Sequence, residues 1–251
     1  MKIINHQSSI RLCRISILNF LLLLATTATA ADSTRWTLPE ARYSISGSIE
    51  YAYNKSWGHF ANIDAQALLP INRHFEMNVN LQASFKNVYT VGVILRPKFP
   101  LPVGELFFDT EVLYKAVMRA NQMDLVTALS LGWRFDYLSV QIGSYCRVME
   151  NYGREWNSEE AYNIEPFNLL YRLEVFCRPQ SENWNLSAIF ANYDDFQFER
   201  MWQPLFMLTG RYDIDDHWRV QLLAECKPTG MFHLNAAFYG FTLRAGFTYR
   251  F

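Results

Sequence analysis

The chain has 251 residues, and its 23 Lys plus Arg against 24 Asp plus Glu give a formal net charge of −1. This balance excludes the strongly basic proteins that bind nucleic acid through phosphate contacts. The length suits one domain with a substantial core, or one membrane barrel. Aromatic residues make up 16% of the chain, which is a high share, so large apolar side chains are available to whichever surface the fold presents.

The N-terminus predicts a secretory signal peptide over residues 1–30. Three basic residues and no acid accompany the apolar run ISILNFLLLLA, and small residues follow up to Ala30. The mature chain, 31–251, would hold 23 − 3 = 20 basic against 24 acidic residues, a formal charge of −4. A short segment, 31–42, precedes the first predicted strand. No later stretch is apolar enough for a membrane helix, so the mature chain folds in water or crosses a membrane as strands.

Alternation of apolar and polar residues is the main pattern of the mature chain. In FEMNVNLQASF, residues 75–85, every second residue is apolar and every residue between is polar, which is the period of a β-strand. The same pattern recurs often enough to predict twelve strands. Their approximate bounds are 43–53, 60–69, 75–85, 88–96, 105–115, 123–135, 137–149, 165–177, 184–193, 203–213, 218–226 and 240–251.

The predicted connections are short in one series and longer in the other. Short turns follow the second, sixth, eighth and tenth strands, whereas the long connections fall at about 150–163, 194–202 and 227–239. All nine prolines lie in connections or at strand ends, where a missing backbone donor is tolerated. Short turns at one end and long loops at the other are typical of a barrel that crosses a membrane with both termini on one side.

Three features together resemble Gram-negative outer-membrane β-barrels. They are the signal peptide, the alternating strands throughout 43–251, and a final strand that ends in FTYRF. The resemblance implies an all-β fold, a single antiparallel transmembrane barrel of about twelve strands, located in the bacterial outer membrane and surrounded by its lipid. It also implies that Phe247, Tyr249 and Phe251 form the signal that such barrels present to their assembly machinery. It implies no particular activity.

A secreted soluble barrel or sandwich is the structural alternative, because it alternates too, with the apolar face turned inward. A soluble surface would carry more charge than these polar faces, where Ser44, Ser46, Asn78 and Gln82 are neutral. The membrane interpretation is therefore preferred. Cys146, Cys177 and Cys226 all fall on apolar faces, and we expect them to be small hydrophobic residues facing lipid rather than disulfide partners.

If the apolar faces meet lipid, the opposite faces line the interior, where function would lie. In the first six strands this lining is mainly acidic, with Glu50, Asp64, Glu76, Glu105, Asp109, Glu111 and Asp124 against Arg96, Lys115 and Arg134. In the last six it is mainly basic, with Arg147, Arg172, Arg211, Arg219 and Arg244 against Glu174 and Glu225. The sequence therefore predicts a charge-segregated lumen, which either forms a water-filled pore with a transverse field or is plugged by ion pairs.

Strand number does not decide between these two states. Eight strands give a filled interior and sixteen an aqueous channel, so twelve lies between. No segment of the sequence resembles a plug, and the loop at 194–202 is expected to be external. The predicted function is a small passive channel for polar solutes, without a cofactor, a metal or a nucleic-acid partner.

Two other functions remain open. A closed structural or surface-binding barrel would act through the loop 150–163, where Tyr152, Trp156 and Tyr162 are candidates for stacking on a sugar or a protein. A lipid-modifying enzyme would be centred on His59 and His233, with Ser56 nearby. The spacing of those residues matches no catalytic motif, and no glycine-rich phosphate loop or zinc-ligand pair is present in the sequence.

Overall fold

The structure is a computed structural model that describes residues 42–101, 103–151, 162–178, 183–229 and 237–251. The predicted signal peptide, 1–30, and nearly all of segment 31–42 lie outside the described residues. Across the described ranges, no helix is both long and apolar enough to cross a membrane.

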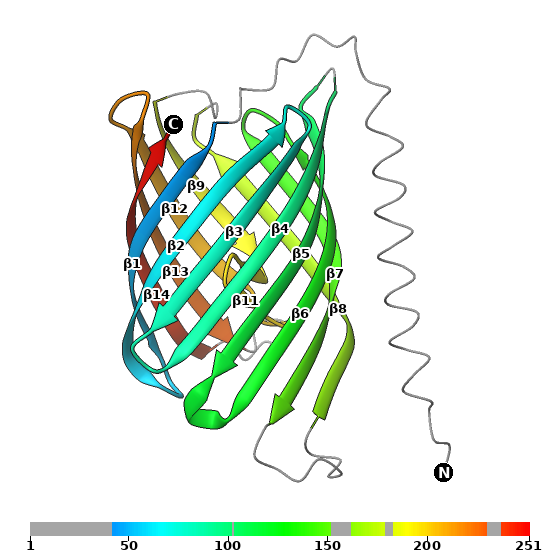
Figure 1. Ribbon diagram of the computed structural model, residues 1–251, viewed down its shortest axis with the longest axis vertical. Helices are drawn as coiled ribbons and strands as arrows, with labels where there is room; N and C mark the ends of the chain where they lie inside the picture. The colour runs from blue at the N-terminus through cyan, green and yellow to red at the C-terminus, as the bar shows by residue number, and fades with distance from the viewer. Residues whose placement is uncertain (1–41, 102, 152–161, 179–182, 230–236) are drawn as a thin grey trace. The chain divides into compact units, whose positions relative to one another are not determined.

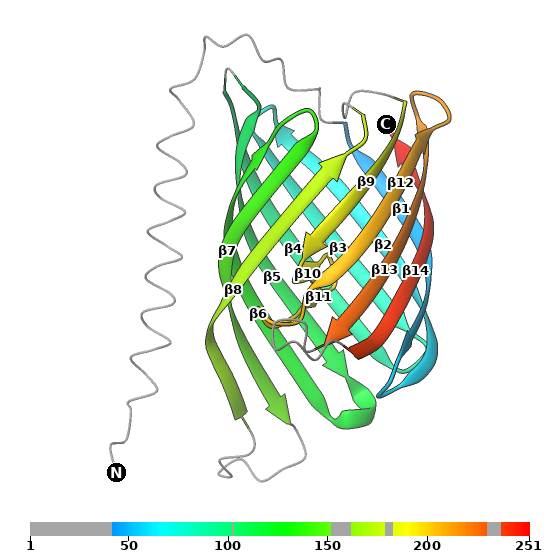
Figure 2. The ribbon, with the colours of Figure 1, turned by 180° about the vertical axis from the view of Figure 1, so that it is seen from behind.

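Twelve antiparallel strands close into one barrel, in which each strand pairs with the next and the last pairs with the first (Figures 1 and 2). The closing pair spans the full length of the first strand, from Ser44 opposite Arg250 to Asn54 opposite Gly240. The all-β, twelve-stranded fold is therefore confirmed. The barrel strands are β1 (Ser44–Asn54), β2 (Gly58–Asn72), β3 (Phe75–Ser84), β4 (Val88–Pro100), β5 (Glu105–Val117), β6 (Gln122–Arg134), β7 (Leu138–Asn151), β8 (Tyr162–Phe176), β9 (Trp184–Ala191), β12 (Leu205–Asp213), β13 (Trp218–Thr229) and β14 (Ala237–Arg250).

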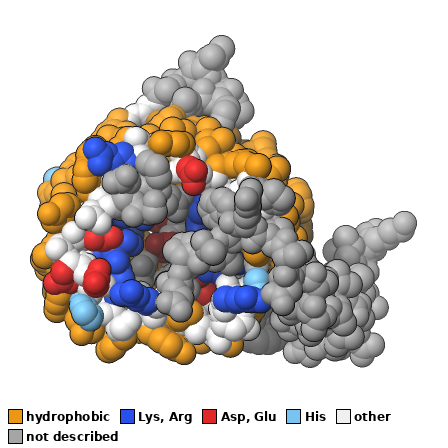
Figure 3. All heavy atoms as spheres, turned by 90° about the horizontal axis from the view of Figure 1, so that it is seen from above, with side chains coloured by type: hydrophobic (Ala, Val, Ile, Leu, Met, Phe, Trp, Pro, Cys, Tyr) orange, Lys and Arg blue, Asp and Glu red, His pale blue; other side chains and the backbone are white. Residues whose placement is uncertain are grey.

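The barrel carries its apolar side chains on the outside. In β1, Ile45, Ile49 and Tyr51 are exposed, whereas Glu50 and Ala52, on the other face, are buried. Viewed from the end where β1 begins and β14 ends, hydrophobic side chains form the rim and charged ones lie toward the middle (Figure 3). An exposed apolar band around a polar interior is the arrangement of a transmembrane β-barrel, because lipid replaces water as the outer solvent.

The cysteines follow the predicted faces. Cys177 and Cys226 are exposed free thiols on the outside, and Cys146 is half-buried on β7. Cys146 and Cys177 lie far apart along the β7–β8 pair, because Tyr145, next to Cys146, faces Asn168, which is 177 − 168 = 9 residues before Cys177. This separation is far beyond disulfide reach.

Two barrel strands are short, and the chain between them turns inward. β9 has 8 residues and β12 has 9, whereas β8 has 15. Between them a small hairpin, β10 (Tyr193–Asp194) paired with β11 (Gln197–Phe198), lies within the barrel (Figures 1 and 2). The expectation of an external loop at 194–202, and of an interior without an inserted segment, is therefore wrong. The chain turns inward because the hairpin contacts an apolar cluster on the inner wall and the buried Arg244.

Candidate functional site

An apolar cluster on the inner wall anchors the hairpin. Tyr193 and Phe198 stack with ring centroids 5.7 Å apart, and Phe198 also lies 5.3 Å from the ring of Tyr145. The wall contributes buried apolar side chains from four successive strands, β5 to β8, namely Leu113, Val126, Ala128, Tyr145 and Leu170. In a water-filled interior these apolar side chains would be exposed to solvent. The aromatic hairpin buries them, and this burial stabilises its position inside the barrel.

Asn192 sets the point at which the chain leaves the barrel wall. β9 ends at Ala191, so β8 loses its partner strand beyond Arg172. The backbone N–H of Tyr171 instead donates to Asn192 Oδ1 at 2.9 Å, and Asn192 Nδ2 donates to the carbonyl of Leu169 at 2.8 Å. The side-chain amide therefore replaces the missing ladder contacts of an otherwise unpaired edge.

Arg244 of β14 ties the hairpin to the closing strands. Its Nη2 lies 2.5 Å from Glu50 Oε2 and 3.6 Å from Asp194 Oδ2, and its Nε lies 3.1 Å from Asp64 Oδ2. The guanidinium also lies 5.0 Å from the ring centroid of Phe196. One buried cation thus connects β1, β2 and β14 with the hairpin, and its three carboxylate partners compensate its charge.

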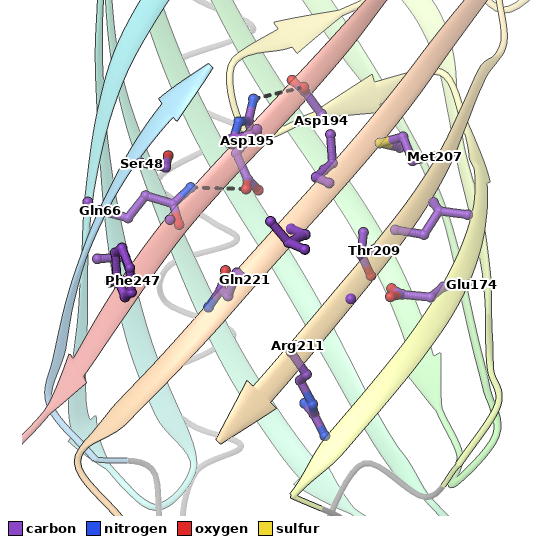
Figure 4. Close-up of a pocket in the computed structure, with 18 of the residues that line it drawn as sticks. Ser48, Gln66, Glu174, Asp194, Asp195, Met207, Thr209, Arg211, Gln221 and Phe247 are labelled. Atoms are coloured by element: carbon purple, nitrogen blue, oxygen red, sulfur yellow. Dashed lines mark hydrogen bonds and ion pairs between the residues drawn. The ribbon is translucent and has the colours of Figure 1, made fainter. Parts of the chain in front are cut away.

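Further polar contacts hold the hairpin on two more walls. Gln66 Nε2 of β2 donates to Asp195 Oδ2 at 3.0 Å, as Figure 4 shows, and Asn80 Nδ2 of β3 donates to the Asp195 carbonyl at 3.4 Å. On the other side of β1 and β14, Gln197 Nε2 donates to Glu225 Oε1 of β13 at 3.1 Å. Together with the apolar cluster on β5 to β8, these contacts hold the hairpin across the interior.

Three cavities surround the hairpin, and Asp194 lines all of them. The loop-side cavity, about 510 Å³, lies toward the β1–β2 turn and includes Trp57, Lys115 and Lys227 in its lining. Toward the chain termini lie the Arg211 cavity, about 260 Å³, and the Glu111 cavity, about 200 Å³. Figure 4 shows the Arg211 cavity with Glu174, Thr209 and Arg211 on its wall. The hairpin thus lies between a loop-side and a terminus-side part of the interior, and Asp194 borders both parts.

The structure places the thirteen predicted lining residues on the inner face of the barrel. The seven acids, which are Glu50, Asp64, Glu76, Glu105, Asp109, Glu111 and Asp124, are all buried there. The six arginines are partnered or line cavities on the same face: Arg134, Arg147, Arg172, Arg211, Arg219 and Arg244.

Opposite charges meet locally on the inner face. Arg96 Nε of β4 lies 2.6 Å from Asp109 Oδ1 of β5. Arg147 of β7 reaches Asp124 of the neighbouring β6 at 2.5 Å. On β8, Arg172 lies 3.2 Å from Glu174. These local pairs offset part of the desolvation penalty of the buried ions.

The hairpin residues are the part of the site that the sequence did not predict. Two signals pointed to them. Strand alternation assigns four apolar residues to the inner face, where a water-filled lumen needs polar groups. They are Leu113, Val126, Ala128 and Leu170. The predicted external loop also contains an alternating Phe196-Gln-Phe198 pair, unusual for a solvated loop. Together, these indicate an aromatic segment inserted against an apolar inner patch.

The other candidate residues lie elsewhere. His59 is on the outer face of β2, where Tyr51 OH and His59 Nδ1 are 2.6 Å apart, and Ser56 Oγ lies 3.0 Å from Tyr239 OH. Neither contact joins Ser56 to His59. Tyr152, Trp156 and His233 lie outside the described residues, as does the side chain of Tyr162.

The C-terminal aromatic residues lie on the outside near the end of the barrel. Phe247 and Phe251 are exposed, and the ring of Tyr249 lies 5.0 Å from those of both Trp218 and Phe251. The Phe251 N–H donates to the carbonyl of Tyr43 at 2.9 Å. The final strand is thus fully incorporated in the closed sheet.

The chain matches no protein-family model, and no curated protein sequence matches it. Among solved structures, it is similar to the KdgM porin in complex with disordered oligogalacturonate, at 11% identity over 83% of this chain and 99% of that one, with a TM-score of 0.50. The NanC porin matches at 9% identity over 82% and 100%, with a TM-score of 0.50. The translocator domain of autotransporter NalP from Neisseria meningitidis matches at 10% identity over 97% and 98%, with a TM-score of 0.53.

At these identities the likeness shows the fold alone. All three structures share a closed antiparallel barrel with this chain, in agreement with the apolar exterior and polar interior described above. The protein is a twelve-stranded β-barrel of the outer-membrane class.

Proposed function

We propose that this barrel is a passive channel for small polar solutes in a bacterial outer membrane, and that the β10–β11 hairpin is its constriction. The observation that carries the proposal is the presence of polar cavities on both sides of the hairpin, all of them lined by Asp194. A barrel built only for rigidity has no need of charged cavities on both sides of an inserted hairpin. The porin names of KdgM and NanC support the proposal, since the fold serves as a porin in those proteins.

In this proposal the interior charges guide a solute past the constriction. A solute enters the loop-side cavity, exchanges part of its hydration shell for polar side chains, and passes between the hairpin and the wall near Asp194 and Arg244. The mainly acidic β1–β6 wall and the mainly basic β7–β14 wall orient a dipolar solute across the passage. The thirteen lining residues supply this field.

The surroundings of the barrel follow from its outer surface. The apolar exterior contacts outer-membrane lipid, and the aromatic residues Phe247, Tyr249 and Phe251 on the final strand are recognised by the barrel-assembly machinery.

A closed barrel is the second candidate, and the fixed hairpin favours it. Phe198 in the apolar cluster and Arg244 at Asp194 hold the hairpin across the interior from two sides. If these contacts never open, the lumen conducts nothing, and a binding role passes to the loop 150–163.

Single-channel conductance of the refolded protein in a planar bilayer separates the two candidates. Heat-dependent gel migration first establishes that the barrel is folded. Reversal potential under a salt gradient is then compared for wild type, Arg172→Ala, and a matched control, Arg73→Ala, in the exposed turn between β2 and β3. Because Arg172 neutralises Glu174 in the interior, its loss leaves a net negative charge and shifts the reversal potential toward cation preference.

The expected result is discrete conductance steps in all three proteins, with altered ion preference in Arg172→Ala alone. Absence of steps from a folded wild-type barrel would overturn the channel proposal in favour of the closed barrel. An equal shift in Arg73→Ala would show that ion preference is set outside the lumen.

A further inference from the structure

The Glu111 cavity has an excess of negative charge. Three guanidinium groups, those of Arg96, Arg134 and Arg172, line it. Six carboxylates also do so, namely Glu76, Asp109, Glu111, Glu174, Asp194 and Asp195. The charge excess alone does not define a site, because each of these carboxylates can have its own cation.

Four of the six carboxylates have a cationic partner. Arg96 binds Asp109 through two hydrogen bonds of 2.6 and 2.8 Å. Lys98 Nζ lies 2.6 Å from Glu76 Oε2, and Arg172 lies 3.2 Å from Glu174. Arg244 neutralises Asp194 from outside the cavity. Two carboxylates are left over, those of Glu111 and Asp195.

Glu111 has no polar partner among the described residues. Its side chain forms no hydrogen bond or ion pair there, its Oε1 is fully buried, and only 5% of the residue is exposed. Asp195 accepts a hydrogen bond from the neutral amide of Gln66. A buried carboxyl without a compensating charge either stays protonated or binds a cation, so a cation that enters this cavity is stabilised beside the ionised form of Glu111.

Two neutral oxygens in the same cavity give independent support. Tyr193, of which 7% is exposed, has a buried hydroxyl with no hydrogen-bond partner within the described ranges, and Asn78 Oδ1 is likewise buried and unpartnered there. Asn78 and Glu111 flank Ile94 in register across β3, β4 and β5, which sets their Cα atoms about 10 Å apart. Tyr193 belongs to the hairpin and Asn78 to the barrel wall, so the wall and the hairpin each place an unpartnered oxygen at this cavity.

These oxygens define the chemistry of the ligand. A primary ammonium group has one positive charge, three N–H donors and no acceptor, which complements one carboxylate and two further acceptor oxygens. In the described part of the chain, no group of three His, Cys, Asp or Glu side chains is placed to hold a metal ion, which disfavours a metal here. Ile94 and Leu68 supply apolar contact for a short alkyl chain, and a volume of about 200 Å³ limits the ligand to a few heavy atoms.

We propose that the Glu111 cavity binds the ammonium group of a small primary amine, with Glu111 as its charge partner and Asn78 and Tyr193 as acceptors. The proposal deepens the channel function and rests on it, since the amine reaches the cavity through the lumen.

Binding is tested by isothermal titration calorimetry of the detergent-refolded protein with ethylammonium chloride, at constant ionic strength. Tetramethylammonium is the control ligand because it has the same charge and no N–H donor. We expect wild type to bind ethylammonium, Glu111→Gln to bind at least about tenfold more weakly, and Tyr193→Phe to bind several-fold more weakly. Glu199→Gln, a hairpin carboxylate that lines only the loop-side cavity, is the matched control and should bind as wild type does.

The outcomes separate this inference from the channel proposal. No ethylammonium binding to a folded wild type, equal binding of tetramethylammonium, or unchanged affinity in Glu111→Gln overturns the amine site, even if the barrel conducts. Binding with the expected variant pattern supports the site even if no conductance is seen, and then only the channel proposal fails. If Glu111→Gln does not fold, Tyr193→Phe with its single lost hydroxyl carries the same test.

Discussion

Arg244 of the last strand and Asp194 of the inserted hairpin form an ion pair, with Nη2 and Oδ2 3.6 Å apart. The same guanidinium binds Glu50 and Asp64 on the first two strands. One side chain therefore links the closing seam of the barrel with the inserted hairpin. In the proposed channel, this link would keep the position of the hairpin constant as long as the sheet is closed.

Replacing Arg244 by Met tests this coupling, because Met keeps much of the length and loses the charge. The three carboxylates left without their cation should lower the free energy of unfolding by on the order of 3 kcal/mol. The hairpin should also become mobile, which gives larger or noisier conductance steps. Urea unfolding followed by gel migration, together with single-channel recording, measures both effects.

Arg219→Met is the matched control for that variant. Arg219 pairs with Asp213 at the terminus end of the barrel, at 2.5 Å, and does not contact the hairpin. It should lose less stability, since the pair is partly solvated, and keep the wild-type step size and noise because the hairpin stays in place, with any change confined to ion preference. Identical conductance changes in both variants would contradict a specific role for Arg244.

Phe198→Ala tests the apolar anchor of the hairpin. Phe198 is 6% exposed and contacts Tyr145 and Tyr193. Truncating a buried Phe costs about 3–5 kcal/mol, and here the loss should detach the hairpin rather than unfold the barrel. Limited proteolysis should then cut between β9 and β12, and conductance should rise while the folded gel mobility is kept.

The control for Phe198→Ala is Phe167→Ala on β8, where 70% of the residue is exposed. This variant should show neither new cleavage nor altered conductance. If Phe198→Ala is also resistant to protease and conducts like wild type, the apolar cluster does not hold the hairpin.

The packing of the inner wall leaves no room for a side chain at Gly132. A Cβ at this position would lie 2.1 Å from Cζ of Phe107, whose ring is also contacted by the guanidinium groups of Arg96 and Arg134 at 4.9 and 5.1 Å. Gly132→Ala should displace this stack and lower the free energy of unfolding by about 1–3 kcal/mol. Gly47→Ala, which meets no atom within 4 Å, should be near neutral in the same urea titration.

Asp215 makes the turn between β12 and β13 sensitive to acid. The backbone N–H groups of Trp218 and His217 donate to its carboxylate, at 2.7 Å each, and hold the pKa of Asp215 below its ordinary value of 3.8. A carboxyl with a depressed folded pKa stabilises the fold above its unfolded pKa and loses that contribution as pH falls through the folded pKa.

Asp215→Asn keeps the acceptor oxygen and removes the titration. Wild type should therefore be the more stable protein at about pH 5, and its advantage should shrink as the pH falls toward about 2. Urea midpoints of both proteins across this range measure the difference. A constant difference would show that the turn carboxylate is not the titrating group.

The sequence alone determined the barrel and the inward charges. Residues 75–85 were predicted as a strand, and β3 runs from Phe75 to Ser84. Because side chains alternate between two faces, assigning Met77 to lipid automatically assigned Glu76 to the interior. The same parity placed Asp109, Arg172 and Arg244 inside.

Only the tertiary structure decided where residues 192–204 go. The charges of Asp194, Asp195 and Arg200 are typical of a solvated loop, and the aromatic residues Phe196 and Phe198 do not by themselves define the surface that they cover. The direction depends on Tyr193 and Phe198 meeting an apolar patch that β5 to β8 assemble only when the barrel closes. Strand periodicity is a local property of the chain, whereas the position of the hairpin depends on contacts between distant segments, so the free energy of those contacts exists only in the folded barrel.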